Sequence, residues 1–547
     1  MSLNCYSSLI AFVGIAVKCL SVPRTQRSSV GDVLHSLALA LQWLVPICIQ
    51  SIMRSQGIKG PSYRFLHGNT KQIAKMRKEA IYNPMELSHH ILPRIQPHIY
   101  SWMKLYGMNF LLWYGARAQL TVTEPELVKE ILNNKEETYC KIGFQDYIKM
   151  VLGDGLVLST GEKWLKMRKL ANYAFHGENL KGMVPAMLAS VEMMVERWRH
   201  HDGKEIEVFQ EFKVLTSEII SRTAFGSSYL EGEEVFDMLK KMIFIVARNH
   251  YKVRIPCPGI KRFLKTGDEL ELDKIQKEIR DTIINMIKKR EKATMMGELD
   301  GYGSDFLGLL IKAYNDPDKN KRISIDDMID ECKTFYVAGQ ETTASSLTWT
   351  VLLLAIHTDW QDEARKEVLE LFGQQNPTAD GVARLKTMNI IINESLRLYP
   401  PVFHVTREVQ REVRLGQLNI PNKIETYIPT LALHTDYKIW GEDAYLFKPE
   451  RFAGGVAKAT NNSVSSFLPF GLGPRTCVGL NFAITEKKIA LSMILQRYKF
   501  TLSPSYVHSP VQILTMCPQH GVQEFTFMNV EYQTMCWCTG ICRNLHL

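Results

Sequence analysis

The sequence predicts one large, mainly α-helical unit with small β-sheets. Apolar residues recur at three- and four-residue spacing over Leu180 to Arg199 and over Glu269 to Arg290, with charges between them. Extended patterns are short, as in Leu111 to Tyr114 followed by Leu120 to Val122, and in Glu425 to Ile428. After residue 60 no linker rich in Pro, Gly or Ser and no fixed repeat divides the 547 residues. One helical body with small sheets beside it is therefore expected.

The longest predicted helix runs from Ile325 to His357. Ser324 precedes it and Asp327 follows three residues later, which is the pattern of a capping box. Its middle, residues 338–343 (AGQETT), holds a glycine that costs about 1 kcal/mol relative to alanine, next to β-branched residues. This weak point indicates either close packing at Gly339 or a local distortion that leaves room for a site.

Charge and cysteine usage limit the classes of partner and the compartment. The net charge is +9, with Lys and Arg spread among acids, so no nucleic acid partner is expected. An acidic protein partner, an anionic membrane surface or ordinary solvated charge each explains the excess. Eleven cysteines are scattered from Cys5 to Cys542 without a paired framework, which indicates reduced thiols in a cytosolic setting.

The first fifty residues predict a membrane anchor. Two apolar stretches, Cys5 to Val22 and Val33 to Gln50, are each short of, or interrupted within, the ~20 residues that span a bilayer. A basic run from Arg54 to Lys78 follows, and such a flank marks the cytoplasmic side. A cleaved signal peptide is the alternative, but a secreted protein would more often pair its cysteines. The body of the chain is therefore expected in the cytosol.

Residues 470–479 (FGLGPRTCVG) predict a loop that presents a thiolate to a flat cofactor. Cys477 precedes a helix expected to begin near Leu480, where a thiolate gains from backbone N–H groups and the positive end of the helix dipole. A lone cysteine is usually a small buried hydrophobe, but five constrained positions in ten residues point to a site. Two glycines allow close approach of the backbone, an arginine can reach a carboxylate, and a phenylalanine can shield the sulfur: Gly473, Gly479, Arg475 and Phe470.

The pattern Phe-x-x-Gly-x-Arg-x-Cys-x-Gly resembles the haem-binding loop of the cytochrome P-450 superfamily, in which a thiolate ligates the iron. The resemblance covers roughly residues 55 to 522. In the long helix, Ala-Gly-x-Glu-Thr-Thr resembles the family's oxygen-binding groove and includes Glu341 and Thr342. Further signatures are the Glu-x-x-Arg helix, a later arginine, and the Trp-x-x-x-Arg pair that holds a haem propionate: Glu394, Arg397, Arg451, Trp164 and Arg168.

The resemblance implies the cytochrome P-450 fold and a monooxygenase that inserts one oxygen atom from O₂ into an apolar small molecule. Haem b would be the cofactor, with Cys477 as its axial thiolate, while Glu341 and Thr342 would manage the protons. The sequence contains no nucleotide- or flavin-binding glycine motif. Electrons are therefore expected from a separate NADPH-dependent flavoprotein reductase.

The Glu-x-x-Arg motif carries little weight alone, because Glu196 and Arg199 fit it as well and such pairs are usually surface ion pairs. Its position just before residues 399–401 (YPP), which must end the helix, selects Glu394 and Arg397. The resemblance implies that both are buried with Arg451 in a structural, non-catalytic cluster.

The resemblance also implies the organisation of the chain. Residues 1–50 would form the anchor, 51–522 the catalytic domain, and 523–547 an atypical C-terminal tail, because the family ends soon after residue 522. The protein is expected at the endoplasmic reticulum membrane with its catalytic domain on the cytosolic face. Residues 422–424 (NKI) lack the turn glycine that relatives usually have there.

Residues 56–61 (QGIKGP) and 502–510 (LSPSYVHSP) resemble a plant branch of the superfamily that oxidises gibberellins, other hormones and terpenoids. The substrate is therefore expected to be a terpenoid, a hormone or another specialised metabolite. His404 could bind a substrate carboxylate or face solvent. The candidate pocket residues are Phe335, Phe403, His404, Val405, Leu514 and Thr515.

Other functions fit parts of the pattern. A haem-thiolate isomerase or dehydratase would need neither O₂ nor electrons, and the intact Glu341-Thr342 pair argues against it. A non-catalytic haem sensor or membrane scaffold would show no NADPH-dependent oxygen consumption with the reductase. A helical protein without a cofactor would show no Soret absorption.

Overall fold

The computed structural model describes residues 43–134, 138–142, 146–227, 229–249 and 266–528. The expected anchor in residues 1–50 thus lies almost wholly outside the described residues, as does the end of the expected tail. Residues 43–55 are helical. None of the described helices combines the length and the apolar character that a bilayer crossing requires.

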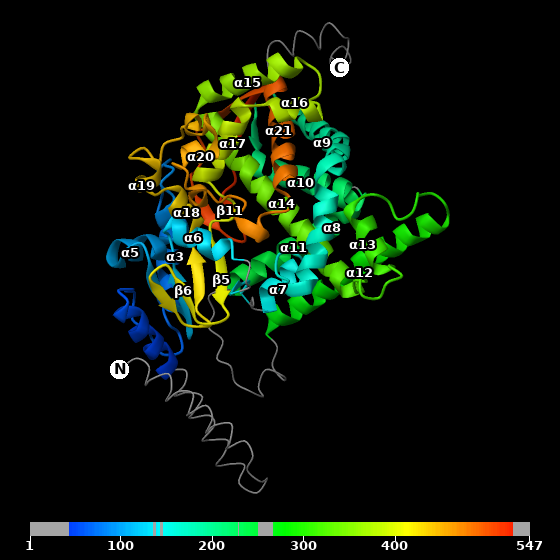
Figure 1. Ribbon diagram of the computed structural model, residues 1–547. Helices are drawn as coiled ribbons and strands as arrows, with labels where there is room; N and C mark the ends of the chain where they lie inside the picture. Colours follow the sequence, from blue (N-terminus) through cyan, green and yellow to red (C-terminus); the bar gives the residue numbers. More distant parts are fainter. Residues whose placement is uncertain (1–42, 135–137, 143–145, 228, 250–265, 529–547) are drawn as a thin grey trace.

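Helices form most of the molecule (Figure 1), as the sequence predicts, and their apolar faces share one large core. The two amphipathic patterns correspond to α9 and α12. After the helix at residues 43–55 come α3 Thr70–Tyr82, α4 Leu92–Ile95, α5 Pro97–Tyr106, α6 Pro125–Leu132, α7 Asp146–Leu152, α8 Gly161–Phe175, α9 Gly177–Trp198, α10 Val208–Phe225, α11 Tyr229–Asn249, α12 Gly267–Met295 and α13 Phe306–Tyr314. The others are α14 Ile325–Ile356, α15 Thr358–Phe372, α16 Ala379–Arg384, α17 Thr387–Leu398, α18 Thr430–His434, α19 Tyr437–Trp440, α20 Gly455–Ala459 and α21 Leu480–Arg497.

The strands form small sheets beside the helices (Figure 1). The largest has the order β1-β2-β8-β5-β3, and it contains the predicted extended segments at 111–114, 120–122 and 425–428. The strands are β1 Phe110–Tyr114, β2 Arg117–Thr121, β3 Tyr139–Cys140, β4 Glu205–Glu207, β5 Val405–Val409, β6 Val413–Leu415, β7 Leu418–Ile420, β8 Glu425–Ile428, β9 Tyr498–Leu502, β10 Pro510–Gln512, β11 Met516–Pro518 and β12 Gln523–Met528.

Strand β12 pairs antiparallel with both β9 and β4 in a three-stranded sheet. Its residues, Gln523–Met528, belong to the segment that the sequence assigns to a separate tail. They are instead part of the folded body, because their backbone groups complete the ladders of two other strands. Residues 529–547 lie outside the described residues.

Helix α14 is the predicted long helix, and its start confirms the capping box. Ser324 Oγ accepts from the Asp327 N–H at 3.0 Å, and the Asp327 carboxylate accepts from the Ser324 N–H at 2.9 Å. The helix continues unbroken through residues 338–343. A Cβ on Gly339 would lie 2.8 Å from the Ile220 side chain of α10, so the glycine allows these two helices to pack closely.

The missing turn glycine also has a structural consequence. Lys423, between β7 and β8, has a φ of +62°, in the left-handed region that glycine adopts without strain. Its N–H donates to the Val409 carbonyl at 2.6 Å, which holds the turn against β5. The turn geometry is therefore kept even though its residue is unsuited to it.

Candidate active site

The loop of residues 470–479 leads into α21, which begins at Leu480 as predicted. Within it, the Cys477 N–H donates to the Phe470 carbonyl at 2.9 Å and closes the loop. The Cys477 side chain keeps accessible surface, although desolvation by surrounding protein raises the pKa of its thiol. The Gly479 backbone N–H and the Arg168 charge act in the opposite direction and favour the thiolate. Cys477 therefore lies on the wall of an internal space.

The two loop glycines differ from what the sequence suggests. Gly473 has a φ of +74°, and a Cβ there would lie 2.3 Å from the Leu132 carbonyl oxygen of α6. Its small size thus serves a tight turn and packing against α6. Gly479 has an ordinary φ of −89°, and its Cβ would be 3.9 Å from the Cys477 sulfur. The surroundings of Gly473 and Gly479 therefore do not by themselves indicate a cofactor.

Helix α8 brings the predicted Trp-x-x-x-Arg pair to this loop. The Arg475 guanidinium lies 4.0 Å from the centre of the Trp164 ring, and its Nη1 donates to the Ser159 carbonyl at 2.9 Å. Arg168 Nη1 donates to the Thr476 carbonyl at 2.6 Å. The structure therefore places Trp164, Arg168 and Arg475 next to one another and to the cysteine.

Sequence reasoning missed two further cations, Arg407 of β5 and Lys141 just after β3. Burial and the charges of Arg407 and Arg475 lower the pKa of Lys141 to about 7, and burial lowers that of Arg407 to about 10. Among the described residues, neither Lys141 nor Arg407 has a carboxylate partner. Arg407 lies in the mixed sequence Val-Thr-Arg-Glu-Val of β5, which gives no signal that its arginine is buried.

These cations provide a direct test of whether haem fits. Buried charges require compensation, and Lys141 and Arg407, which have no carboxylate partner among the described residues, leave a place for an anion. Haem b carries two carboxylates on the edge of a flat ring. The donor set of Lys141, Arg407, Arg475 and Arg168 suits those carboxylates, and Cys477 suits the iron.

On the α14 side, Ala338 and Thr342 keep accessible surface in the middle of a mostly buried helix, which packs against α21. Thr342 Oγ1 donates to the Ala338 carbonyl at 2.8 Å, so its lone pairs remain available as acceptors. Glu341 is buried and forms an ion pair with Lys213 of α10 at 3.3 Å.

A small pocket between α10, α11 and α14 opens beside this ion pair. Gln340 Nε2 donates to Ser217 Oγ at 2.5 Å across it. Exposed Asp237 and Lys240 lie on the outer part of the lining, so the pocket extends from the surface to the buried Glu341. The pocket is lined by Gln210, Lys213, Val214, Ser217, Phe236, Asp237, Lys240, Gln340 and Glu341.

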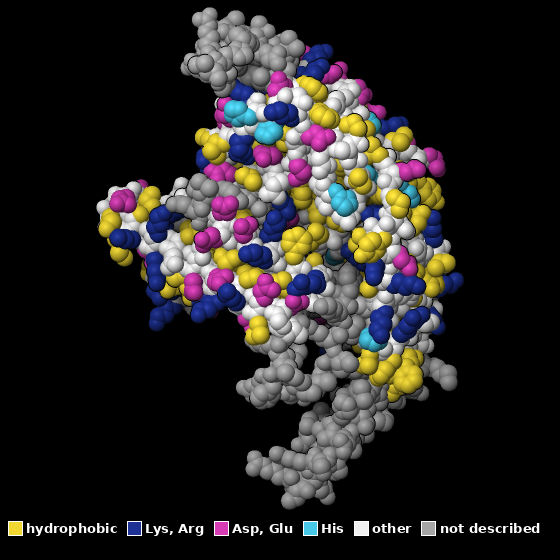
Figure 2. Space-filling view, turned by 180° about the vertical axis from the view of Figure 1, so that it is seen from behind, with side chains coloured by type: hydrophobic (Ala, Val, Ile, Leu, Met, Phe, Trp, Pro, Cys, Tyr) yellow, Lys and Arg dark blue, Asp and Glu magenta, His cyan; other side chains and the backbone are white. Residues whose placement is uncertain are grey.

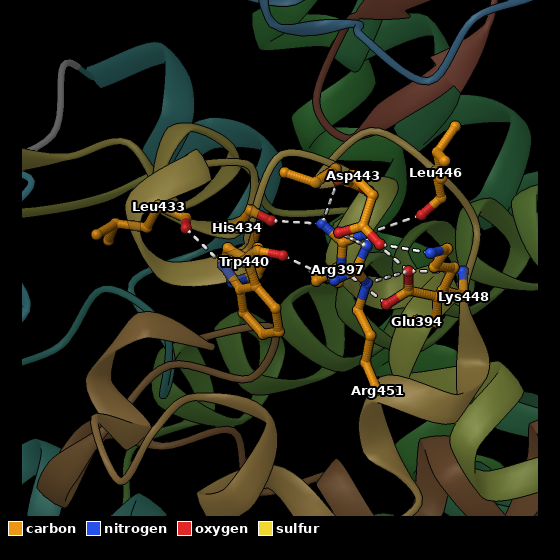
Figure 3. Close-up of polar contacts among 10 residues, drawn as sticks. Glu394, Arg397, Leu433, His434, Trp440, Asp443, Leu446, Lys448 and Arg451 are labelled. Carbon is orange, nitrogen blue, oxygen red and sulfur yellow. Dashed lines mark hydrogen bonds and ion pairs between the residues drawn. The ribbon is translucent and has the colours of Figure 1, made fainter.

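The residues of the expected structural cluster meet in the interior (Figure 3). Arg397 donates twice to Glu394, through Nε at 2.8 Å and Nη2 at 2.7 Å, and both side chains are fully buried. Arg451 Nε lies 3.5 Å from Glu394, and its Nη2 lies 2.6 Å from Asp443. Two charged hydrogen bonds from Lys448 and Arg451 lower the pKa of Asp443 to about 2. The cluster fastens α17 to the chain between α18 and α20.

Two of the candidate pocket residues lie in other surroundings. Phe335 stacks on Phe175 of α8 at 5.1 Å and contacts Phe306, so it belongs to an aromatic part of the core. His404 stacks on Tyr427 at 4.9 Å. Because side chains alternate along a strand, His404 lies on the face of β5 opposite Arg407, away from the cations.

The other candidates come from two segments that the fold brings together. The Met516 N–H donates to the Pro401 carbonyl at 3.1 Å, and the Met516 carbonyl accepts from Ser345 and Trp349 of α14. The turn before Met516 and the segment after Pro401 therefore lie side by side against α14. Val405 and Leu514 are partly accessible, whereas Phe403 and Thr515 are buried.

Comparison with known proteins decides the family. A family model described as Cytochrome P450 matches residues 88–521. The chain is a cytochrome P450. Cytochrome P450 CYP749A22 of Panax ginseng is 59% identical over 483 residues, which cover 88% of this chain and 92% of that protein. Cytochrome P450 734A1 of Arabidopsis thaliana is 42% identical, and secologanin synthase 2 of Catharanthus roseus is 41% identical, each over 88% of this chain and 92% of the relative.

The family membership confirms the expected fold, the plant branch and the enzyme class. Cytochromes P450 hold haem b through a cysteine thiolate, and this chain is a haem-dependent monooxygenase. The alternatives of a non-catalytic sensor and of a cofactor-free helical protein are thereby set aside.

Proposed function

We propose that this P450 uses Cys477 as its iron ligand and hydroxylates an apolar plant metabolite of the terpenoid or hormone class. The observation that carries the ligand assignment is the position of Cys477 in a loop that Arg168 contacts through the Thr476 carbonyl. Arg475 of the same loop lies over Trp164, and its charge acts on the buried Lys141 together with that of Arg407. The substrate class is supported by the similarity to plant P450s, one of which is named a secologanin synthase.

When bound, the haem supplies an iron that activates O₂. The protein's own residues create the conditions for that chemistry. Arg168 and the Gly479 N–H favour the anionic form of the Cys477 sulfur. Arg168, Arg475, Arg407 and Lys141 would hold the haem carboxylates.

Protons are delivered from the α14 side. The Glu341 carboxylate exchanges protons with solvent through the pocket beside it, and its ion pair with Lys213 holds it there between transfers. The Thr342 hydroxyl, which donates to the Ala338 carbonyl, would accept a hydrogen bond from a water molecule and orient it for proton transfer. Both groups act as acid–base residues of the monooxygenase cycle.

A separate NADPH-dependent flavoprotein reductase supplies the electrons, and the enzyme resides on the cytosolic face of the endoplasmic reticulum membrane. The first described helix supports the membrane location. Its exposed apolar side chains include Trp43 and Leu44, with Phe65 close by and the exposed charges of Arg54 and Arg64 next to them. Figure 2 shows hydrophobic side chains gathered at that end of the molecule, whereas charges of both signs are mixed elsewhere on the same face.

The ligand assignment is tested with the reduced carbon monoxide complex. The wild-type protein should show the red-shifted Soret band of thiolate ligation, and Cys477→Ala should lose it. Cys48→Ala, on the first described helix, is the matched control and should keep the band. A red-shifted band in Cys477→Ala would refute the assignment. Metabolite profiling of plant cells that gain or lose the protein then identifies the substrate.

A further inference from the structure

We propose that His434 is a positioning residue that connects the buried Glu394–Arg397 cluster to the haem loop and thereby maintains thiolate ligation by Cys477. His434 is the last residue of α18 and is fully buried. His434 lies beside the cluster (Figure 3), and it also contacts Leu468 in the segment that enters the haem loop. This inference rests on the proposed role of Cys477.

His434 contacts both structures through different atoms. Its backbone carbonyl accepts a hydrogen bond from Arg397 Nη1 at 2.8 Å. Its ring Nε2 accepts one from the Leu468 N–H, also at 2.8 Å. The ring additionally packs against Phe467, with ring centres 5.3 Å apart. One residue thus anchors the start of the loop to the charged cluster.

From Leu468, short-range hydrogen bonds continue to the cysteine. The Leu468 carbonyl accepts from the Gly471 N–H at 3.1 Å, and the Phe470 carbonyl accepts from the Cys477 N–H at 2.9 Å. A shift of Leu468 would therefore move both turns that set the position of the sulfur. The buried Leu468 N–H also needs an acceptor, because an unsatisfied buried donor is costly.

The ring can accept this bond only when Nε2 is unprotonated. Burial lowers the pKa of His434 to about 3, and the neighbouring Arg397 charge contributes in the same direction, against a smaller opposite effect of the Arg397 and Leu396 backbone. The ring is therefore neutral at physiological pH, with its proton on Nδ1. A protonated imidazole would turn a donor toward the Leu468 N–H and break the connection.

Two substitutions separate the hydrogen bond from simple bulk. His434→Gln places an amide oxygen near the position of Nε2 and can accept from Leu468, whereas His434→Leu fills a similar volume with no acceptor. Trp440→Phe is the control for local stability. It removes the Nε1–H bond to the Leu433 carbonyl at 2.9 Å in the same region without contacting Leu468.

The assay follows the reduced carbon monoxide spectrum over time at one temperature. His434→Leu should convert from the thiolate-ligated band to the blue-shifted form roughly tenfold faster than wild type, the effect of one lost buried hydrogen bond. His434→Gln and Trp440→Phe should stay within about threefold of wild type. Amide exchange in a peptide covering residues 467–477 should rise in His434→Leu and remain slow in His434→Gln.

Equal conversion rates for the Leu and Gln variants would overturn the proposal, since their difference is the acceptor. If His434→Leu does not accumulate, the Gln variant decides: fast amide exchange at residues 467–477 in that variant would also overturn it. The proposed ligand role fails separately, because then Cys477→Ala would keep the red-shifted band.

Discussion

Gly473 and Gly479 lie six residues apart in the haem loop, yet replacing them with alanine should have very different effects. At Gly473 the φ of +74° makes a Cβ cost about 1–2 kcal/mol. The same Cβ would lie 2.3 Å from the Leu132 carbonyl oxygen, and overpacking of this kind costs a further ~1–3 kcal/mol. The free energy of unfolding should therefore fall by about 2–5 kcal/mol in Gly473→Ala.

Gly479→Ala is the matched variant. Its φ is −89° and its Cβ would make only an ordinary 3.9 Å contact with the Cys477 sulfur, so its unfolding free energy should change by less than about 1 kcal/mol. Chemical denaturation followed by tryptophan fluorescence measures both, and haem content per protein reports the state of the loop. Equal stabilities of the two variants would show that contact with α6 does not govern the loop.

Three other predictions concern strain, buried charge and proton delivery. Lys423→Gly should raise the midpoint of thermal unfolding, because it removes about 1–2 kcal/mol of left-handed backbone strain. This gain outweighs the cost of the greater conformational entropy that glycine gives to the unfolded chain. A lower midpoint would contradict the prediction. Arg397→Met leaves the buried Glu394 carboxylate without its partner, so the free energy of unfolding should fall by about 3–5 kcal/mol or haem incorporation should be abolished. Arg199→Met has the same Glu-x-x-Arg spacing at the surface and should lower the free energy of unfolding by under about 1 kcal/mol. Similar losses of stability in the two variants would refute the distinction between a buried and a surface pair. Thr342→Ala should fold and bind haem, yet it should release hydrogen peroxide at the expense of product. Thr342→Ser keeps the hydroxyl and should retain much of the coupling between NADPH consumption and product formation. Equal product per NADPH in the alanine variant and the wild type would assign proton delivery to another group.

Local patterns in the sequence were sufficient to predict several helices and strands and part of the candidate active site. The capping box at Ser324 and the helix start at Leu480 depend on neighbouring residues, so both could be predicted. The periodicity of α14 placed Phe335 on a helix but could not show which helix it would contact, and α8 is its partner.

The parts that were missed depend on contacts between distant segments. Arg407 and Lys141 are separated by more than 250 residues, and the sheet pairing of β3 with β5 brings them together, where Arg475 also acts on Lys141. Strand β12 was assigned to a tail because the family pattern ends near residue 522, and its pairing with β4, about three hundred residues earlier in the chain, could not be foreseen. Neither relationship leaves a periodic signal in a single sequence.

The position of β12 has a consequence for synthesis of the protein. Strand β4 ends at Glu207, and its partner begins only at Gln523, so the sheet cannot form until translation is nearly complete. At about 5–20 residues per second, the ribosome needs roughly 16–60 s to make the intervening chain. During that interval β4 and, later, β9 expose backbone groups that other chains could pair with. Chaperones that cover nascent chains would therefore be needed longest around residues 205–207, and a stop codon before residue 523 would leave those edges open permanently.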